Sequence, residues 1–179
     1  MHKIRETEFF DDDLYEEDDD EDTMKDKYLT FRLGKEVYGI EICHVIEIVG
    51  IQKITEVPDM PDYVKGVINL RGQVIPVMDV RTRFHMAQEE YNERTCVIVA
   101  RIEDTDIGLV VDRVEEVADI PGENISPAPK VGKGTKNRYI KGLGKSGEDV
   151  KIILDISRLL FDEEGASLPL PEQTEELSL

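Results

Sequence analysis

The sequence has little that would place it in a membrane or outside the cell. It contains no run of about 18 apolar residues, the length that a transmembrane helix requires. Its first residues include no apolar core of the kind found in export signals. Only two cysteines occur, Cys43 and Cys96. We therefore expect a cytoplasmic protein in which both thiols are reduced and buried.

The sequence also lacks the motifs of common active sites. Its three histidines, His2, His44 and His85, have no partners at the spacing of metal ligands. Cys43 precedes His44, but adjacent residues of an extended strand point to opposite faces, so no catalytic dyad is expected. VGKGTK at 131–136 lacks the spacing of a phosphate-binding loop. We expect no enzymatic activity, no metal and no cofactor.

Charge is abundant but concentrated at the two ends. The formal net charge is −18. Residues 1–27 carry −9 and residues 162–179 carry −6, which leaves only −3 for residues 28–161. Acidic runs such as DDDLYEEDDDED repel themselves and bury little surface, so we predict two acidic tails, the first of them disordered, around one folded region. A basic face for nucleic acid is not expected.

The middle of the chain has the pattern of an all-β protein. YLTFRL, from Tyr28, alternates apolar and polar residues, and a turn at Gly34-Lys35 precedes VYGIEI, which predicts a hairpin. Further short runs rich in Val and Ile predict strands: QVIPVMDV, TCVIVARI, DIGLVVDRV and VKIILDI. Short helices are predicted at 43–48, 62–67 and 156–161. Many short strands at this spacing favour barrels or a sandwich.

One segment occurs twice. YVKGVINLRGQVIPVMDV begins at Tyr63, and YIKGLGKSGEDVKIILDI begins at Tyr139, 76 residues later. YGIEICHVIEIV likewise matches DIGLVVDRVEEVA, with Gly39 aligned to Gly108. One unit of about 60 residues would bury too little surface to be stable alone. The repeats, near 38–84 and 107–161, therefore predict two small barrels that pack together.

Two features suggest a binding surface. Ile42, Val45 and Ile48 form an apolar series next to the hairpin; they fit a core, or a groove that receives an amphipathic helix. NLRG at 69–72 falls at a predicted turn and presents Arg71, which fits either a turn residue or a partner for a carboxylate.

Four motifs together resemble the chemotaxis coupling protein (CheW) family: YGIEICHVIEI, PDYVKGVINLRG, VIPVMDV and GLVVDRV. The resemblance covers residues 28–161. It implies an all-β fold of two intertwined five-stranded SH3-like barrels with a shared apolar interface and a few short helices. It also implies a non-enzymatic adaptor, which binds the cytoplasmic tip of methyl-accepting chemotaxis receptors and the regulatory domain of the histidine kinase CheA. Such an adaptor is recruited to membrane-associated receptor clusters.

The resemblance also implies site residues. For the receptor these are an apolar groove, a polar contact at Glu47 and two sensitive positions at Gly66 and Arg71. For the kinase we expect Ile54 and Val57. Val49-Gly50 departs from the Arg-Gly of many members, so one receptor-facing charge is missing. A paralogue that serves a non-flagellar chemosensory pathway would share all these features. The residues expected in the groove are Leu29, Ile42, Val45, Ile48 and Val114.

Overall fold

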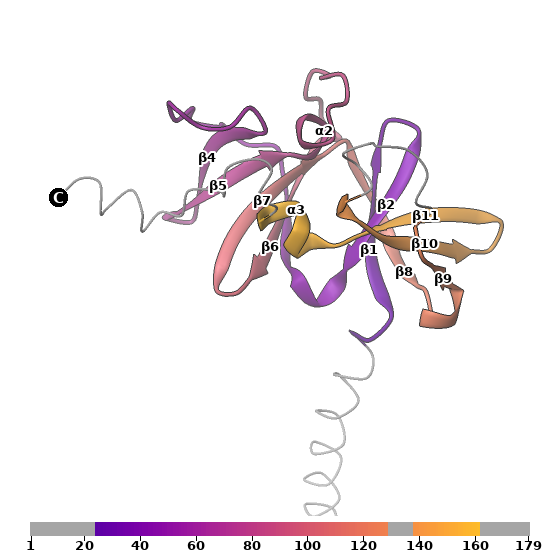
Figure 1. The fold of residues 1–179 in the computed structure, drawn as a ribbon. Coiled ribbons are helices and arrows are strands. Elements are labelled where there is room, and N and C mark those ends of the chain that lie inside the picture. Colours follow the sequence, from indigo (N-terminus) through magenta and orange to yellow (C-terminus); the bar gives the residue numbers. More distant parts are fainter. Residues whose placement is uncertain (1–23, 129–137, 162–179) are drawn as a thin grey trace, which may run out of the picture.

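The computed structural model describes residues 24–128 and 138–161 (Figure 1). Nearly all regular structure in these residues is β-strand, so the all-β prediction is confirmed. The elements are β1 (Lys27–Leu33), β2 (Glu36–Glu41), η1 (Ile42–His44), β3 (Val45–Gly50), β4 (Val64–Leu70), β5 (Gln73–Asp79), α2 (Val80–Arg83), β6 (Cys96–Ile102), β7 (Thr105–Val111), β8 (Arg113–Asp119), η2 (Gly122–Asn124), β9 (Ile125–Ser126), β10 (Ile140–Ser146), β11 (Asp149–Leu154) and α3 (Ile156–Phe161).

The predicted acidic tails fall almost entirely outside the described residues. Of the N-terminal tail, only residues 24–27 are described, and Lys27 already belongs to β1. The VGKGTK segment also lies outside them. No helix in the described part of the chain is both long and apolar enough to cross a bilayer.

The strands form two sheets that exchange hairpins. One sheet has the order β8-β1-β2-β11-β10-β9 and is called barrel A here. The other has the order β3-β6-β7-β5-β4 and is called barrel B. In Figure 1, barrel B lies on the left and barrel A on the right. Barrel A thus combines the hairpin β1-β2 of the first repeat with β8, β9, β10 and β11 of the second. Barrel B combines the hairpin β6-β7 of the second repeat with β3, β4 and β5 of the first, which confirms the predicted intertwining.

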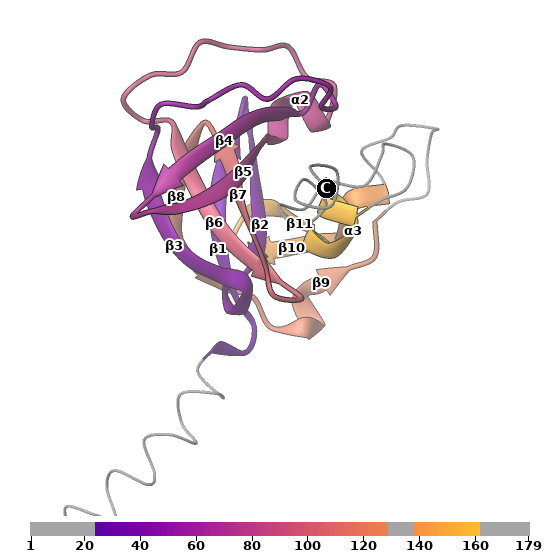
Figure 2. The same ribbon diagram turned by 90° about the vertical axis from the view of Figure 1, so that its left-hand side faces the viewer.

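Each sheet is curved, and a segment of the chain connects its two edge strands. After β3, the chain continues to Thr55, which pairs with Val67 of β4 on the opposite edge of barrel B. After β8, the chain runs through η2 into β9, which pairs with β10. Figure 2 shows barrel B from its outer side, with β3 and β4 curving toward each other. These connections leave few unpaired edge groups.

The two copies of the repeated segment occupy equivalent places. The Asp79 N–H donates to the Tyr63 carbonyl at 2.8 Å, and the Asp155 N–H donates to the Tyr139 carbonyl at 2.8 Å. The parallel pairs that join each hairpin to its barrel are also equivalent, Val77–Gly108 in barrel B and Ile153–Gly39 in barrel A. The repeat read from the sequence therefore corresponds to a repeat in hydrogen bonding.

The largest apolar cluster is shared by both barrels. It contains 21 buried residues, against seven in the interior of barrel B and four in that of barrel A. Both faces of β6 are apolar because each face packs into a different core. Val97 and Val99 point into barrel B, while Ile98 and Ala100 point into the shared core. Burial between the barrels therefore exceeds burial within either, and the two barrels depend on each other for stability.

Two predicted helices are wrong. Residues 43–48 contain only the end of the single turn η1, followed by β3, and residues 62–67 lead directly into β4. The spacing of Ile42, Val45 and Ile48 suits a helix, but Ile42 lies in η1 and burial alternates along β3, so Val45 and Ile48 point to opposite sides of the strand. The third predicted helix, at 156–161, is confirmed as α3.

Candidate functional site

Four of the predicted groove residues border the shared core. Leu29 on β1 is only 2% exposed and belongs to the core itself. Ile42, Val45 and Val114 are partly buried and pack against that core. Val45 and Val114 hold equivalent positions in the two repeats, at the starts of β3 and β8. The fold therefore gathers these residues at the junction of the barrels, with Leu29 as a supporting residue.

Ile48 differs from the other groove residues because it faces solvent. It is 42% exposed on β3, the edge strand of barrel B, and Ile46 on the same strand is exposed to a similar extent. Alternation along β3 explains this, since Glu47 and Val49 point to the more buried side. Two exposed isoleucines on one strand offer apolar surface to a partner. The sequence did not single out Ile46, although its period-two relation to Ile48 could have revealed it.

Glu47 and Arg71 form an ion pair. Arg71 belongs to the turn between β4 and β5, and its Nη2 donates to Oε1 of Glu47 on β3. The Arg71 side chain is 71% exposed, so much of its guanidinium surface remains accessible. Two predicted site residues, 24 positions apart in sequence, are thus brought together beside Ile46 and Ile48.

The backbone at Arg71 is in an unusual conformation. Its φ is 52°, and that of Gly72 is 85°. Two-residue hairpin turns with both φ values positive strongly prefer Asn-Gly or Gly-Gly. An arginine in this place costs about 1 kcal/mol in backbone strain. In this conformation the turn presents the Arg71 side chain that pairs with Glu47.

Gly66 is important for a structural reason. Its φ is +146°, and it lies at a bulge between β4 and β5. A Cβ atom at this position would lie 2.0 Å from the Thr55 carbonyl oxygen. Gly66 therefore allows the close approach that closes barrel B. Its predicted sensitivity follows from this contact.

The two residues predicted to contact the kinase lie beyond β3. Ile54 is partly buried and packs against the interior cluster of barrel B. Val57 is also partly buried, in the irregular segment before β4. Both therefore lie on the segment that joins the edges of barrel B.

A further polar group lies next to the groove. Lys141 on β10 donates to Glu41 at the end of β2, and this hydrogen bond lowers the pKa of Glu41 and raises that of Lys141. Cys43 donates to the same carboxylate at 3.8 Å, and burial raises the pKa of its thiol. Cys43 is exposed, contrary to the prediction of two buried thiols.

The polar residues around a cavity of about 330 Å³ are engaged with one another. Tyr91 donates to Asp79 at 2.6 Å, and burial raises the pKa of the Tyr91 hydroxyl. Arg81 donates two hydrogen bonds to Asp112, at 2.6 and 2.5 Å. These contacts hold α2 against the corner after β7 and the loop after α2 against the end of β5. The described residues around this cavity show no pairing of a nucleophile with a general base.

Comparison with known proteins gives a consistent result. The family model described as "CheW-like domain" matches residues 27–164. The chain belongs to the CheW-like family. It is 41% identical over 145 residues to a protein named "Chemotaxis protein CheW" from Klebsiella aerogenes, covering 81% of this chain and 87% of that one. It is 34% identical over 142 residues to the protein of the same name from Treponema pallidum, covering 76% and 82%.

The fold agrees with a solved structure of the CheW-like family. The crystal structure of scaffolding protein TtCheW from Thermoanaerobacter tengcongensis matches with a TM-score of 0.74 and 33% identity. The match covers 81% of this chain and 98% of that one. The expectation of two SH3-like barrels is thereby confirmed for the described residues.

Proposed function

We propose that this protein is a chemotaxis adaptor that binds two partners at once. One is the cytoplasmic tip of a methyl-accepting chemotaxis receptor, and the other is the regulatory domain of the histidine kinase CheA. Membership of the CheW-like family supports this role. The adaptor would be recruited to receptor clusters and would act by positioning the kinase, without catalysing a reaction.

The observation that carries the receptor contact is the arrangement on β3. Ile48 is exposed, and Ile42 and Val45 lie half-buried at the junction of the barrels. Arg71, which forms an ion pair with Glu47, provides a charged rim. A helix binds to such a surface by placing apolar side chains against the half-buried residues and polar ones against the rim. The strained backbone at Arg71 supports the same reading, because strain of this kind concentrates at functional sites.

The kinase contact is proposed for the segment that contains Ile54 and Val57. Both residues are partly buried, and Thr55 between them is held by its pairing with Val67. The segment therefore presents a fixed backbone on which a partner could dock. It leaves β3 free for the receptor.

Ile48→Asp tests the receptor surface. An aspartate here would meet the apolar side of a bound helix, so the affinity for a receptor-tip fragment should fall about tenfold or more, as measured by calorimetry. Val117→Asp is a matched control, because Val117 is the equivalent residue on β8 of barrel A and is 51% exposed. Val45 is less suitable for substitution, since its side chain packs on the core.

The outcomes separate the two proposed contacts. Ile48→Asp should retain the affinity for the kinase regulatory domain, since Ile54 and Val57 lie elsewhere on barrel B. Equal loss of receptor binding in the Ile48 and Val117 variants would contradict the β3 surface. Absence of binding to both partners by the folded wild-type protein would contradict the adaptor role itself.

A further inference from the structure

Three different metal-binding side chains meet at the turn η1. Glu41 is the last residue of β2, and Cys43 and His44 lie in η1. A 3₁₀ turn places residues three apart on the same side, which brings His44 next to Glu41. Oε2 of Glu41 lies 3.8 Å from Sγ of Cys43 and 3.9 Å from Nε2 of His44. One ligand atom from each residue lies within 4.8 Å of the other two.

We propose that Glu41, Cys43 and His44 form a binding site for a zinc-class transition-metal ion. Zinc binds thiolate sulfur at about 2.3 Å and imidazole nitrogen or carboxylate oxygen at about 2.0–2.2 Å. In a tetrahedral site these bond lengths place the ligand atoms about 3.5 Å apart. The two separations from Oε2 exceed that value by only a few tenths of an ångström. The ligand atoms of Cys43 and His44 lie within 4.8 Å of each other, so side-chain rotations are needed to bring all three atoms to metal-binding distance, and water would take the fourth position.

The surroundings favour this geometry. Glu41 and Cys43 line an open cavity of about 360 Å³, so an ion and its water can enter; Asp26 and three lysines also border it, namely Lys25, Lys27 and Lys141. Lys141 binds Oε1 of Glu41, which leaves Oε2 directed at the thiol and the imidazole. Partners of this kind orient metal-binding carboxylates. On binding, the Cys43 thiol loses its proton to solvent, and the thiolate and carboxylate then balance the charge of the divalent ion.

The donor set predicts which ions bind. A thiolate, an imidazole and one carboxylate suit Zn²⁺ and Co²⁺, whereas Mg²⁺ and Ca²⁺ require mainly oxygen ligands. The acidic run at 11–22 offers only oxygen ligands to a metal. A signal that requires thiolate therefore separates the η1 site from ions held by the acidic run.

The location of the site suggests an effect on the adaptor. Ile42 is the first residue of the turn η1, and Val45 is the residue directly after that turn. An ion at Glu41, Cys43 and His44 would fix the conformation of η1 and thereby the position of both side chains. This effect on receptor binding rests on the proposed function; the metal site does not.

The test is a titration of the reduced full-length chain with Co²⁺, followed by absorbance. The wild type should bind one equivalent with a thiolate-to-cobalt band in the near ultraviolet. Cys96→Ser is the matched control and should behave like the wild type, because the Cys96 thiol donates to the Arg94 carbonyl, away from η1. Cys43→Ser should abolish the band, and His44→Ala should weaken binding about tenfold or more.

A second measurement distinguishes the site from damage to the fold. Zn²⁺ should raise the melting temperature of the wild type and of Cys96→Ser but not of Cys43→Ser, and all three should melt alike without metal. Excess Mg²⁺ should not displace Co²⁺. Binding of Co²⁺ to the wild type without a thiolate band, or a band that persists in Cys43→Ser, would overturn the proposal.

Discussion

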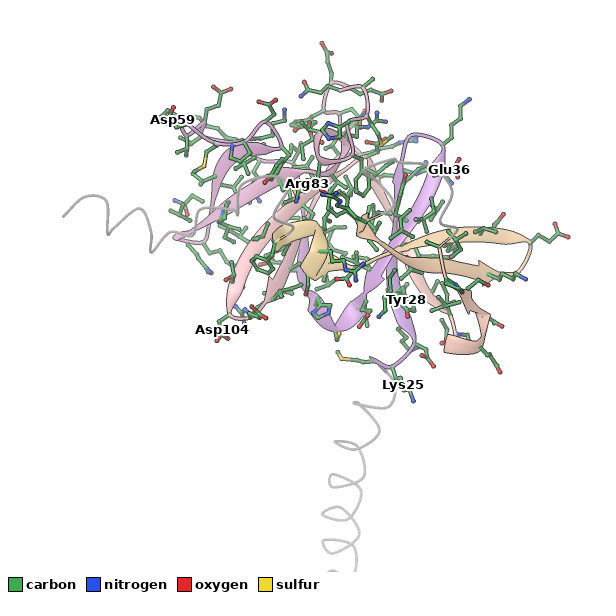
Figure 3. The ribbon with its side chains drawn as sticks, in the orientation of Figure 1. Lys25, Tyr28, Glu36, Asp59, Arg83 and Asp104 are labelled. Atoms are coloured by element: carbon green, nitrogen blue, oxygen red, sulfur yellow. The ribbon has the colours of Figure 1, made fainter. Side chains whose placement is uncertain are left out.

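The guanidinium of Arg83 lies between the rings of Tyr63 and Tyr139, the first residues of the two repeated segments. Its Cζ is 4.1 Å from the centre of the Tyr63 ring and 4.9 Å from that of Tyr139. Its Nε donates to the carbonyl of Leu159 at 3.1 Å. Leu159 is the repeat-equivalent of Arg83, 76 residues later. Figure 3 shows Arg83 at the centre of the molecule, between the barrels. One cation thus joins both repeats at their meeting point.

Arg83→Met should destabilise the protein. The substitution keeps the apolar stem but removes two cation–π contacts and leaves the Leu159 carbonyl without its donor. We expect a loss of about 2 kcal/mol in the free energy of unfolding, measured with urea. Arg158→Met, on the exposed side of α3, is the control and should change stability by less than about 0.5 kcal/mol. Nη2 of Arg83 is buried and has no hydrogen-bond partner among the residues that the structure describes, so unchanged stability would mean that its desolvation cancels the ring contacts.

Gly66→Ala should prevent barrel B from closing properly. The new Cβ would collide with the Thr55 carbonyl, and the backbone conformation suits only glycine. We expect a loss of about 3 kcal/mol or more, seen as a lower urea midpoint. In Gly50→Ala, apart from the adjacent residues, no heavy atom of the described part of the chain lies within 4 Å of the new Cβ, so stability should remain within about 0.5 kcal/mol of the wild type. Similar losses in both variants would argue against the collision.

Arg71→Asn should weaken binding to the receptor-tip fragment without lowering the stability of the fold. Asparagine tolerates the positive φ of this turn better than arginine, so the free energy of unfolding should stay equal or rise by up to about 1 kcal/mol. The exposed ion pair with Glu47 contributes little to stability. The affinity for the receptor-tip fragment should nevertheless fall, as measured by calorimetry. If affinity were retained, Arg71 would be only a turn residue.

The Arg81–Asp112 pair should make stability depend on pH in the acid range. Burial opposes ionisation of Asp112, but hydrogen bonds from Arg81 and from the Gly34 N–H outweigh it, so the pKa of Asp112 is lowered. A lowered pKa gives stability that is complete above the unfolded value of about 3.9 and is lost as the pH falls through the folded value. The free energy of unfolding, measured by urea titration at several pH values below about pH 5, should change less steeply with pH in Asp112→Asn than in the wild type.

Arg81→Gln provides an independent check of the same pair. It removes the partner and leaves the carboxylate, so it should flatten the acid dependence in the same way. If the free energy of unfolding of either variant depended on pH as steeply as that of the wild type, other carboxylates would control the loss of stability in acid. The pair joins α2 to the corner after β7, and Gly34 belongs to the β1–β2 turn of the other barrel.

The strands could be predicted because their apolar residues alternate. The hairpin from Tyr28 became β1 and β2, and the later Val- and Ile-rich runs became β5, β6, β7 and β11. The prediction failed at β3, where the spacing of three among Ile42, Val45 and Ile48 suggested a helix although burial along the strand alternates. It failed at β4 as well, where Gly66 interrupts the pattern. The error at β3 also concealed the η1 turn, so Cys43 and His44 were placed on opposite faces instead of beside Glu41.

The exchange of hairpins could not be read from residue patterns alone. Because the repeats are equivalent, β1-β2 would find similar partners in either half of the chain. The resemblance to the CheW-like family supplied the intertwining, and it also supplied the groove residues. The Arg83 stack had a weak signal: the motif at Tyr63 recurs at Tyr139, but arginine at position 83 is replaced by leucine at 159.

The exchanged hairpins also determine when each barrel can close as the chain is synthesised. All strands of barrel B lie in one continuous stretch, from Val45 to Val111. Barrel A combines the first two strands with the last four, so its hairpin β1-β2 leaves the ribosome early and waits for β11. Until then only β8, which pairs with β1, and barrel B are available to cover the hairpin, and β2 still lacks its parallel partner β11. We therefore expect barrel B, whose strands are complete first, to hold the N-terminal hairpin until translation reaches the C-terminal strands.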